Sequence, residues 1–220
     1  MTRQSRLLFH MKILITAGPT REWLDPVRFI SNPATGRLGY LLAAEGRKRG
    51  HDIILVSGPT CLEPPAGVVF VPVESARQME EKVRQFFPEA DCLFMTAAVS
   101  DWRPRFRRNK IKHKSGIRLT LFSNPDILSA CGKNKRPDQV LIGFALETRN
   151  LIEEGKKKMK EKRLDYILVN DPDFFGKEKG RHVSLFISRK GKVTDLSNYS
   201  KEDISRFLFD HCLTICNNPS

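Results

Sequence analysis

The sequence predicts an α/β protein with a doubly wound, mostly parallel (Rossmann-like) sheet. Short apolar runs rich in β-branched residues alternate with amphipathic stretches of helical spacing. Strand and helix in repeating order are typical of a parallel sheet that helices cover on both faces. The first two runs, residues 12–16 and 52–57, are each followed by a Gly-Pro pair that ends the strand.

The remaining elements follow from the same patterns. Ser75 is a suitable N-cap for one helix, and Asn124 with Pro125 predicts the start of another. Further strands are expected at 68–73, 91–99, 139–145 and 165–170, a hairpin at 183–195, and helices at 38–49, 75–86, 124–131, 150–163 and 201–216.

One segment interrupts this order. Residues 102–122 are basic and contain proline, and they end in an alternating stretch, IRLTLF, which predicts an inserted flap or β-excursion. Residues 1–10 precede the first strand and are expected to be an N-terminal extension. We therefore expect a single domain over 11–220 that carries this flap.

Composition narrows the class of partner. The formal net charge is +13, and basic residues are dense at 102–114 and 156–162, which favours anionic ligands such as a triphosphate. No segment is long and apolar enough to suggest a membrane span. The five cysteines show no CxxC spacing and the histidines no metal-binding spacing. Free thiols and a cytoplasmic protein are therefore expected.

The segment NPATGRLG, residues 32–39, lies between the end of the first strand and a helix start. Gly36 and Gly39 would let an anion approach the helix N-terminus, and Arg37 adds positive charge. The segment is neither GxGxxG nor a Walker loop. A tight strand–helix turn and an anion-binding loop both remain open on this pattern alone.

Other candidates have two readings each. Asp101 follows a strand and could hold Mg²⁺ or a sugar hydroxyl, or be a turn aspartate. Lys110 could close over a triphosphate or be a solvated surface lysine. Lys158 and Lys162 share a helix face and could flank an anion, and Phe144 could stack on a base or pack in the core. No Ser-His-Asp or Cys-His arrangement is present, which favours positioning and positive charge over acid–base chemistry.

Taken in order, the motifs resemble one family. They are ITAGPTRE, LDPVRFISNPATGRLG, LVSGP, AAVSDWRP, NKIKHK, NPDIL, GFALET, a KxxxK pair and VND. These resemble segments of the phosphopantothenoylcysteine synthetases, in the family's order, from about residue 12 to 187. A flavin-dependent decarboxylase half precedes this activity in many bacteria. A stand-alone synthetase is the expectation here, with such a decarboxylase as a potential separate partner.

The resemblance implies a ligase of coenzyme A biosynthesis that consumes one nucleotide in two chemical steps. The carboxylate of 4′-phosphopantothenate attacks the α-phosphate of CTP (ATP in eukaryotic relatives), giving an acyl-nucleotide and pyrophosphate. The amine of L-cysteine then displaces CMP. The resemblance also implies Mg²⁺ on the triphosphate and a homodimer with strands exchanged near the flap.

The family's site residues carry over position by position. Asn32 resembles the asparagine that holds the acyl-nucleotide, Arg28 a residue near the phosphopantothenate site, and Lys110 the flap lysine of the second half-reaction. Asp101 would serve the nucleotide or its cation. The nucleotide pocket is implied at Gly36, Gly39, Met95, Thr96, Ala97, Asp101, Asn124, Pro125, Asp126, Ile127, Phe144, Lys158 and Lys162.

The chain also departs from the family. The usual Ser-Ser-Gly-Lys is Ala34-Thr35-Gly36-Arg37, and the second alanine of GFAAET is Leu146. The nucleotide preference therefore stays open. Two rival functions also remain: a Rossmann-type oxidoreductase, although GxGxxG is missing, and a basic nucleic-acid-binding module, although no known motif supports it.

Overall fold

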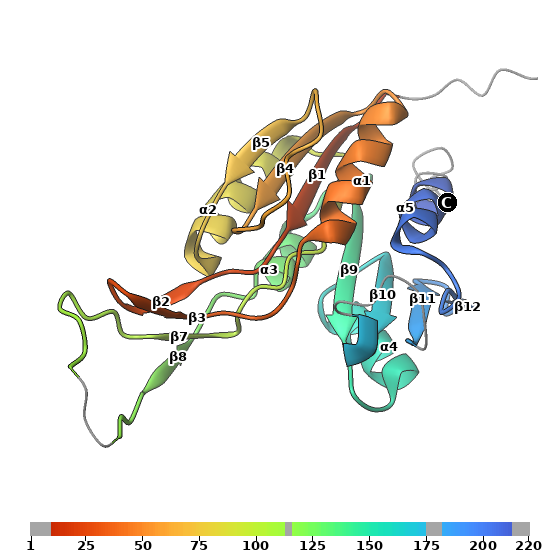
Figure 1. The fold of residues 1–220 in the computed structure, drawn as a ribbon. Coiled ribbons are helices and arrows are strands. Elements are labelled where there is room, and N and C mark those ends of the chain that lie inside the picture. Colours follow the sequence, from red (N-terminus) through yellow and green to blue (C-terminus); the bar gives the residue numbers. More distant parts are fainter. Residues whose placement is uncertain (1–9, 113–115, 175–181, 213–220) are drawn as a thin grey trace, which may run out of the picture.

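The computed structural model describes residues 10–112, 116–174 and 182–212. Eight strands of the described residues form one central sheet (Figure 1). They are β1 (Lys12–Ala17), β4 (Asp52–Ser57), β5 (Val69–Pro72), β6 (Cys92–Met95), β9 (Val140–Leu146), β10 (Tyr166–Asn170), β11 (Ser184–Ser188) and β12 (Val193–Asp195).

The strand order confirms the predicted fold class. The sheet runs β12-β11-β10-β9-β6-β1-β4-β5. The six strands from β10 to β5 pair in parallel, whereas β11 and β12 are antiparallel. Numbered along the chain, the parallel strands lie in the order 6-5-4-1-2-3, which is the doubly wound order of Rossmann folds. The order reverses between β1 and β6, and ligands in such sheets bind beyond the strand ends at that point.

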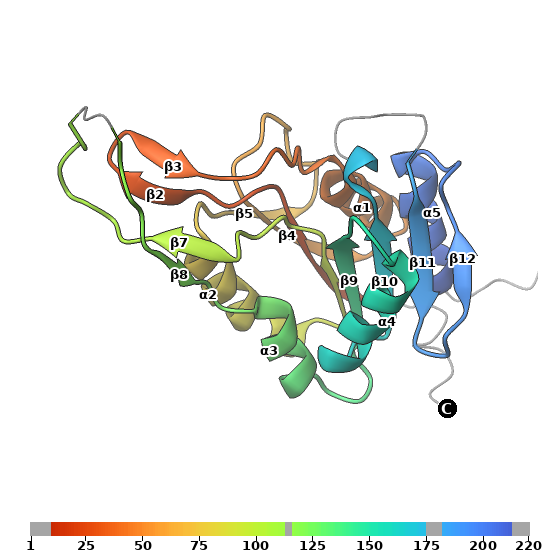
Figure 2. The same ribbon diagram turned by 90° about the horizontal axis from the view of Figure 1, so that it is seen from below.

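Helices cover both faces of the sheet (Figure 2). The buried residues divide into two clusters, one on each face. One face carries α1 (Arg37–Lys48) and α5 (Lys201–Cys212), and the other carries α2 (Ala76–Phe86), α3 (Ile127–Asn134) and α4 (Leu151–Glu161). Two 3-10 turns, η1 (Phe87–Glu89) and η2 (Pro172–Phe174), follow α2 and β10. β1 is the centre of the core, since Ile13, Leu14 and Ile15 are fully buried.

Helices α1 and α5 lie side by side and run in the same direction. Arg37 at the start of α1 contacts Glu202 at the start of α5, and Arg49 just after α1 contacts Asp210 near the end of α5. Between these ion pairs the helices approach closely. A Cβ atom at Gly46 would lie 2.7 Å from the ring of Phe209. The N-termini of both helices therefore lie at the carboxyl edge of the sheet.

A second feature is an arm that projects from the sheet beyond the end of β1 (Figure 1). The described residues of the arm are 22–30, 102–112 and 116–123. They contain the hairpin of β2 (Glu22–Asp25) with β3 (Arg28–Ile30), and the pair of β7 (Trp102–Pro104) with β8 (Leu121–Ser123). The predicted flap is thus present, but of its alternating stretch only Leu121 and Phe122 belong to a strand. The β2–β3 hairpin was not predicted.

Two predicted boundaries and one predicted cap were wrong. β6 ends at Met95 and not at 99, and an isolated parallel bridge between Pro19 and Ala98 follows it. α3 begins at Ile127, and its N-cap is Asp126, whose carboxylate accepts from Ser129 N at 2.9 Å. Asn124 is not the cap. It holds the neighbouring loop, since its N donates to Asp101 O (2.8 Å) and its Nδ2 to Ser100 O (2.9 Å).

One further prediction was confirmed, and two others concern residues that the structure does not describe. Ser75 caps α2 in a reciprocal capping box with Gln78. The predicted extension before residue 10 and the last turn of the terminal helix lie outside the described residues. Within the described residues, no helix has the length and apolar character needed to cross a membrane.

Candidate active site

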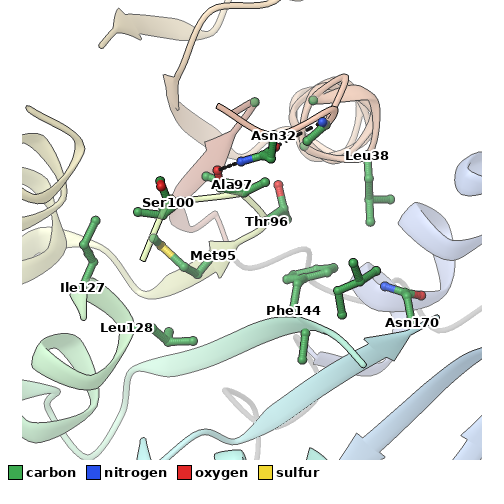
Figure 3. A pocket seen from close by; sticks show the side chains of 18 of the residues that line it. Asn32, Leu38, Met95, Thr96, Ala97, Ser100, Ile127, Leu128, Phe144 and Asn170 are labelled. Atoms are coloured by element: carbon green, nitrogen blue, oxygen red, sulfur yellow. Dashed lines mark hydrogen bonds between the residues drawn. The ribbon is translucent and has the colours of Figure 1, made fainter. Parts of the chain in front are cut away.

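A cleft of about 500 Å³ lies where the strand order reverses. Its walls come from the segments that follow β1, β6, β9 and β10, together with the first turn of α1 (Figure 3). All predicted site residues except Arg28 and Lys110 line this cleft. The sheet edge therefore gathers residues that are more than a hundred positions apart in the sequence.

Asn32 lies where the strand order reverses, and hydrogen bonds hold its side chain to the segments that follow β6 and β3. Its Nδ2 donates to Ala98 O at 2.6 Å, and its Oδ1 accepts from Ala34 N at 3.1 Å (Figure 3). A carboxamide has two N–H donors and two lone pairs on oxygen. One donor and one lone pair thus remain to contact a ligand, and the half-buried side chain has a fixed orientation.

The N-terminus of α1 forms the wall next to Asn32. Its N-cap, Gly36, has φ +79°, a conformation that favours glycine, and a glycine has no side chain to cap the helix. Arg37 N donates to Thr35 Oγ1 at 3.4 Å, and the first turn contains no acidic residue. Gly39 lets the helix approach the sheet, since a Cβ there would lie 2.6 Å from Ala17 Cβ and 2.7 Å from Thr96 Oγ1. The N–H groups of the first turn and the helix dipole favour an anion at this end.

The segment after β6 forms the floor. Thr96 Oγ1 donates to Thr16 O at 2.5 Å, and Ala97 N donates to Thr16 Oγ1 at 3.2 Å. These bonds hold residues 96–97 against the end of β1. Because the Ala97 N–H is already bonded, a ligand would find only the remaining backbone groups of this segment.

The opposite wall carries the two predicted lysines. Lys158 Nζ lies 2.5 Å from Glu147 Oε1, and Lys162 Nζ lies 2.9 Å from Asp126 Oδ2. Each lysine thus has a carboxylate partner, and both side chains line the cleft. Whether they flank an anion, as their spacing suggested, stays a prediction. Phe144, near the carboxyl end of β9, is half-buried and lines the cleft (Figure 3).

Arg28 and Lys110 lie on the arm and do not line the cleft of their own chain. Arg28 Nη1 contacts Asp25 Oδ2 and donates to Ile111 O, both at 2.9 Å. Asp25 is fully buried and also accepts from the backbone N of Ile111 (2.9 Å) and Val27 (2.8 Å). Arg28 thus joins the two halves of the arm.

With this geometry, comparisons with known proteins decide the family. A family model described as the DNA/pantothenate metabolism flavoprotein C-terminal domain matches residues 8–215. The chain belongs to this family. The resemblance to phosphopantothenoylcysteine synthetases seen in the motifs is thereby confirmed.

Curated relatives of this family are longer proteins. The chain is 39% identical over 198 residues to the coenzyme A biosynthesis bifunctional protein CoaBC of Bacillus subtilis (strain 168), covering 88% of this chain and 48% of that protein. It is 35% identical over 215 residues to CoaBC of Escherichia coli (strain K12), covering 94% and 52%. The chain spans about half the length of the curated relatives it matches.

Solved structures of the family share the fold. The crystal structure of the C-terminal domain of CoaBC has a TM-score of 0.81 at 36% identity, and the match covers 94% of this chain and 96% of that one. A Cab2 variant in complex with phosphopantothenate-cysteine has a TM-score of 0.77 at 17% identity, covering 95% and 87%.

The cleft also contains residues to which the sequence analysis gave no role. Asn170 is the last residue of β10 and belongs to the VND motif, and its place at the carboxyl end of a predicted strand could have indicated it. Ser100 lies within the AAVSDWRP motif. Phe174, in η2, and Lys201, at the start of α5, gave no signal, because nothing local predicts that the chain returns to this edge.

The cleft's chemistry fits a cation brought by the ligand better than a resident metal centre. Among the described residues, no group of three or more His, Cys, Asp or Glu could hold a metal ion. Asp101 is exposed at the cleft, whereas Asp126 already caps α3 and pairs with Lys162. Mg²⁺ commonly takes one or two carboxylates and completes its shell with phosphates and water. Asp101 suits that arrangement.

Cys61, Cys92 and Cys131 do not line the cleft. Cys61, Cys92 and Cys131 are free thiols, as predicted. Burial, with a smaller contribution from Asp126, raises the pKa of the Cys131 thiol to about 12. The thiol beside the cleft is therefore protonated at neutral pH.

Proposed function

We propose that this chain is the ligase that joins 4′-phosphopantothenate to L-cysteine through an acyl-nucleotide intermediate. The observation that carries the proposal is the fixed amide of Asn32 beside the N-terminus of α1, whose first turn contains no acidic residue, in the cleft of a family member. An activated carboxyl bonded to a phosphate presents acceptor oxygens. Neutral and cationic donors that are already oriented stabilise such a group most effectively.

In the first step, a carboxylate oxygen of phosphopantothenate attacks the α-phosphorus of the nucleotide, and pyrophosphate leaves. The α1 N-terminus would hold the phosphates. Lys158 and Lys162, on the opposite wall, would supply cationic donors by exchanging their present carboxylate partners for ligand oxygens. Phe144 and the segment 95–97 would contact the base and ribose.

Mg²⁺ bound to the triphosphate would neutralise charge on the leaving pyrophosphate. Asp101 is the residue that would hold it, since its carboxylate is exposed at the cleft. Most of the cation's other ligands would come from the nucleotide.

In the second step, the amine nitrogen of cysteine attacks the acyl carbon. The bond from that carbon to the phosphate oxygen breaks, and the nucleoside monophosphate leaves. Asn32 would hold the anhydride through the N–H donor and lone pair that its bonds to Ala98 and Ala34 leave over. Lys110 would act at this stage.

The nucleotide is proposed to be CTP, with ATP as the alternative. Ala34 and Arg37 replace the serine and lysine usual in the family. The Arg37 guanidinium contacts Glu202 at 2.8 Å, so its charge is directed partly away from the cleft. Such differences alter phosphate contacts and do not identify the base.

The two rival functions have less support than the ligase. A Rossmann oxidoreductase binds its dinucleotide at a glycine-rich turn directly between the first strand and helix. Here the β2–β3 hairpin stands between β1 and α1. A nucleic-acid-binding role would rest on basic charge alone. The curated relatives are bifunctional proteins about twice as long as this chain, so a flavin-dependent decarboxylase is the proposed partner.

The test is pyrophosphate release by the purified protein with phosphopantothenate, cysteine, Mg²⁺ and either CTP or ATP. Release that requires phosphopantothenate is expected, faster with CTP. Asn32→Asp should lower turnover by about a hundredfold or more, because the substitution removes the donor to Ala98 O and adds negative charge beside the phosphates. No release with either nucleotide would refute the proposal.

Asn198→Asp is the matched control, since Asn198 is exposed after β12, away from the cleft. This variant should keep the wild-type rate. If Asn32→Asp also keeps it, the role given to Asn32 is wrong even if the protein proves to be the ligase.

A further inference from the structure

The start of α5 reaches the cleft, and the proposed function gives no role to its first residue, Lys201. Lys201 lines the cleft and is half-buried. It is the first residue of its helix, where the helix dipole favours anions and disfavours a cation. The two residues that follow it, Glu202 and Asp203, have the favourable sign. Helix stability therefore does not account for a lysine at this position.

The position of Lys201 is fixed by its neighbours in the sequence. Ser200 and Asp203 bond reciprocally at the helix start: Asp203 N donates to Ser200 Oγ (3.1 Å) and Ser200 N donates to Asp203 Oδ2 (3.3 Å). Glu202 Oε1 accepts from Arg37 Nη2 at 2.8 Å. The bond from Arg37 lowers the pKa of the Glu202 carboxyl, so the ion pair persists through neutral pH.

The ammonium group of Lys201 lies over the ring of Phe174, with Nζ 4.9 Å from the ring centroid. Phe174 is itself buried and lines the same cleft. An aromatic face attracts a cation and helps to hold it in place. Because α1 and α5 start at the same sheet edge, Lys201 lies on the side of the cleft where the α1 N-terminus also presents positive charge.

We propose that Lys201 binds the polyphosphate of the nucleotide, and that the Arg37–Glu202 ion pair is its positioning pair. This inference rests on the nucleotide site of the proposed function. The α1 N-terminus and Lys201 would together bind the β- and γ-phosphates, which leave as pyrophosphate. Two sources of positive charge from helices 164 positions apart in the chain (Arg37 to Lys201) suit a ligand with several adjacent negative charges.

Calorimetry with the full-length protein tests the assignment directly, with inorganic pyrophosphate, CTP and CMP as separate ligands in the presence of Mg²⁺. Lys201→Met keeps the aliphatic length and removes the charge. It should weaken pyrophosphate and CTP roughly ten- to a hundredfold, as for a lost charged hydrogen bond, and CMP less than twofold. Lys201→Arg should retain most of the affinity, and Lys160→Met, on the exposed face of α4, should change none.

The positioning role is tested by Glu202→Gln, which frees Lys201 without removing it. This variant should weaken pyrophosphate less than Lys201→Met does. Because Glu202 also holds Arg37, the comparison is made in an Arg37→Met background as well. In both backgrounds, adding Glu202→Gln to Lys201→Met should cause no further loss of affinity. Additive losses would overturn the positioning role.

The outcomes separate this inference from the proposed function. If the wild-type protein binds neither CTP nor pyrophosphate, the nucleotide site itself is wrong. If it binds both and Lys201→Met binds them equally well, the ligase proposal stands and the assignment of Lys201 falls. Equal weakening of CTP and CMP, with a lower melting temperature, would show that Lys201 only supports the fold through Phe174.

Discussion

At the scale of single residues, Asp25 shows how a buried charge can hold an extended element. The carboxylate accepts from Val27 N, Arg28 N, Arg28 Nη1 and Ile111 N. These bonds lower the pKa of Asp25 below the ordinary value of about 3.9, and the hydrogen bond from Ile111 N contributes most. With these hydrogen bonds, the Asp25 carboxylate joins the β2–β3 hairpin to the flap segment, although neither the hairpin nor the flap forms a long strand.

The pH dependence follows from the sign of that shift. Because the folded pKa is lowered, the stabilisation from the ionised form is complete above about pH 4 and is lost as pH falls through the folded value. The arm should therefore loosen in acid. Both tryptophans of the chain, Trp23 and Trp102, lie on the arm, so their fluorescence should change below about pH 4.

Asp25→Asn tests this prediction. An amide cannot accept from all these donors, so the variant should show at pH 7 the emission that the wild type shows in acid, with no further change on acidification. Asp138→Asn, at an exposed ion pair, should behave like the wild type. The prediction fails if wild-type emission stays constant until far-UV circular dichroism reports global unfolding.

Single residues also show what the sequence could reveal about the site. Met95, Asp101 and Phe144 lie at or near the ends of predicted strands, so the rule that ligands bind beyond those ends brings them together. Lys158 and Lys162 lie on a predicted helix, and the family resemblance alone placed them in the site. Asn124 was assigned the wrong role. Asn and Asp both cap helices, and Asn124-Pro125 and Asp126 compete as caps two residues apart. The choice depends on Ser100 and Asp101, to which Asn124 bonds across the cleft.

At the scale of elements, the docking of α1 onto the sheet determines the shape of the site. Gly39 faces Ala17 Cβ and Thr96 Oγ1, and the same approach aims the helix N-terminus into the cleft. Two effects oppose each other on substitution by alanine. Helix propensity favours alanine by about 1 kcal/mol. Crowding against a packed strand costs about 1–3 kcal/mol and more where backbone must move.

We expect crowding to prevail, because the nearest atoms are a methyl group fixed to β1 and the hydroxyl bonded to Thr16 O. Gly39→Ala should lower the free energy of unfolding, measured in urea, and weaken CTP binding. Gly116→Ala has no atom within 4 Å of the added Cβ and should be close to neutral. Increased stability of Gly39→Ala would contradict the close packing described.

Elements also differ in how far the sequence predicts them. The central strands are continuous apolar runs, and their type and order followed from the pattern alone. The β2–β3 hairpin was missed because its strands have only four and three residues and β3 is largely exposed. Its pairing depends on contacts distant in sequence: Arg107 N donates to Leu24 O, and Ile111 N to Asp25 Oδ2. No local window contains both partners.

At the scale of the whole molecule, the arm is unusually apolar for a surface. The large apolar side chains exposed on it are Val27, Phe29, Trp102, Phe106, Ile117, Leu119, Leu121 and Phe122. An exposed apolar cluster of this kind commonly marks an interaction surface. The predicted homodimer would cover it and would carry Lys110 and Arg28 to a cleft that their own chain does not offer them.

The last prediction follows from that arrangement. If the arm serves the partner's cleft, Asn32→Asp and Lys110→Ala damage different halves of one composite site. Subunits of the two inactive variants, co-expressed and purified as a dimer confirmed by light scattering, should regain about a quarter of the wild-type activity. Half of the dimers are mixed, and each mixed dimer contains one intact site. Pairing Asn32→Asp with Phe144→Ala, which share a cleft, should restore nothing. A monomer at all concentrations, or no recovery in the mixed dimers, would place Lys110 with its own chain's cleft or outside the reaction.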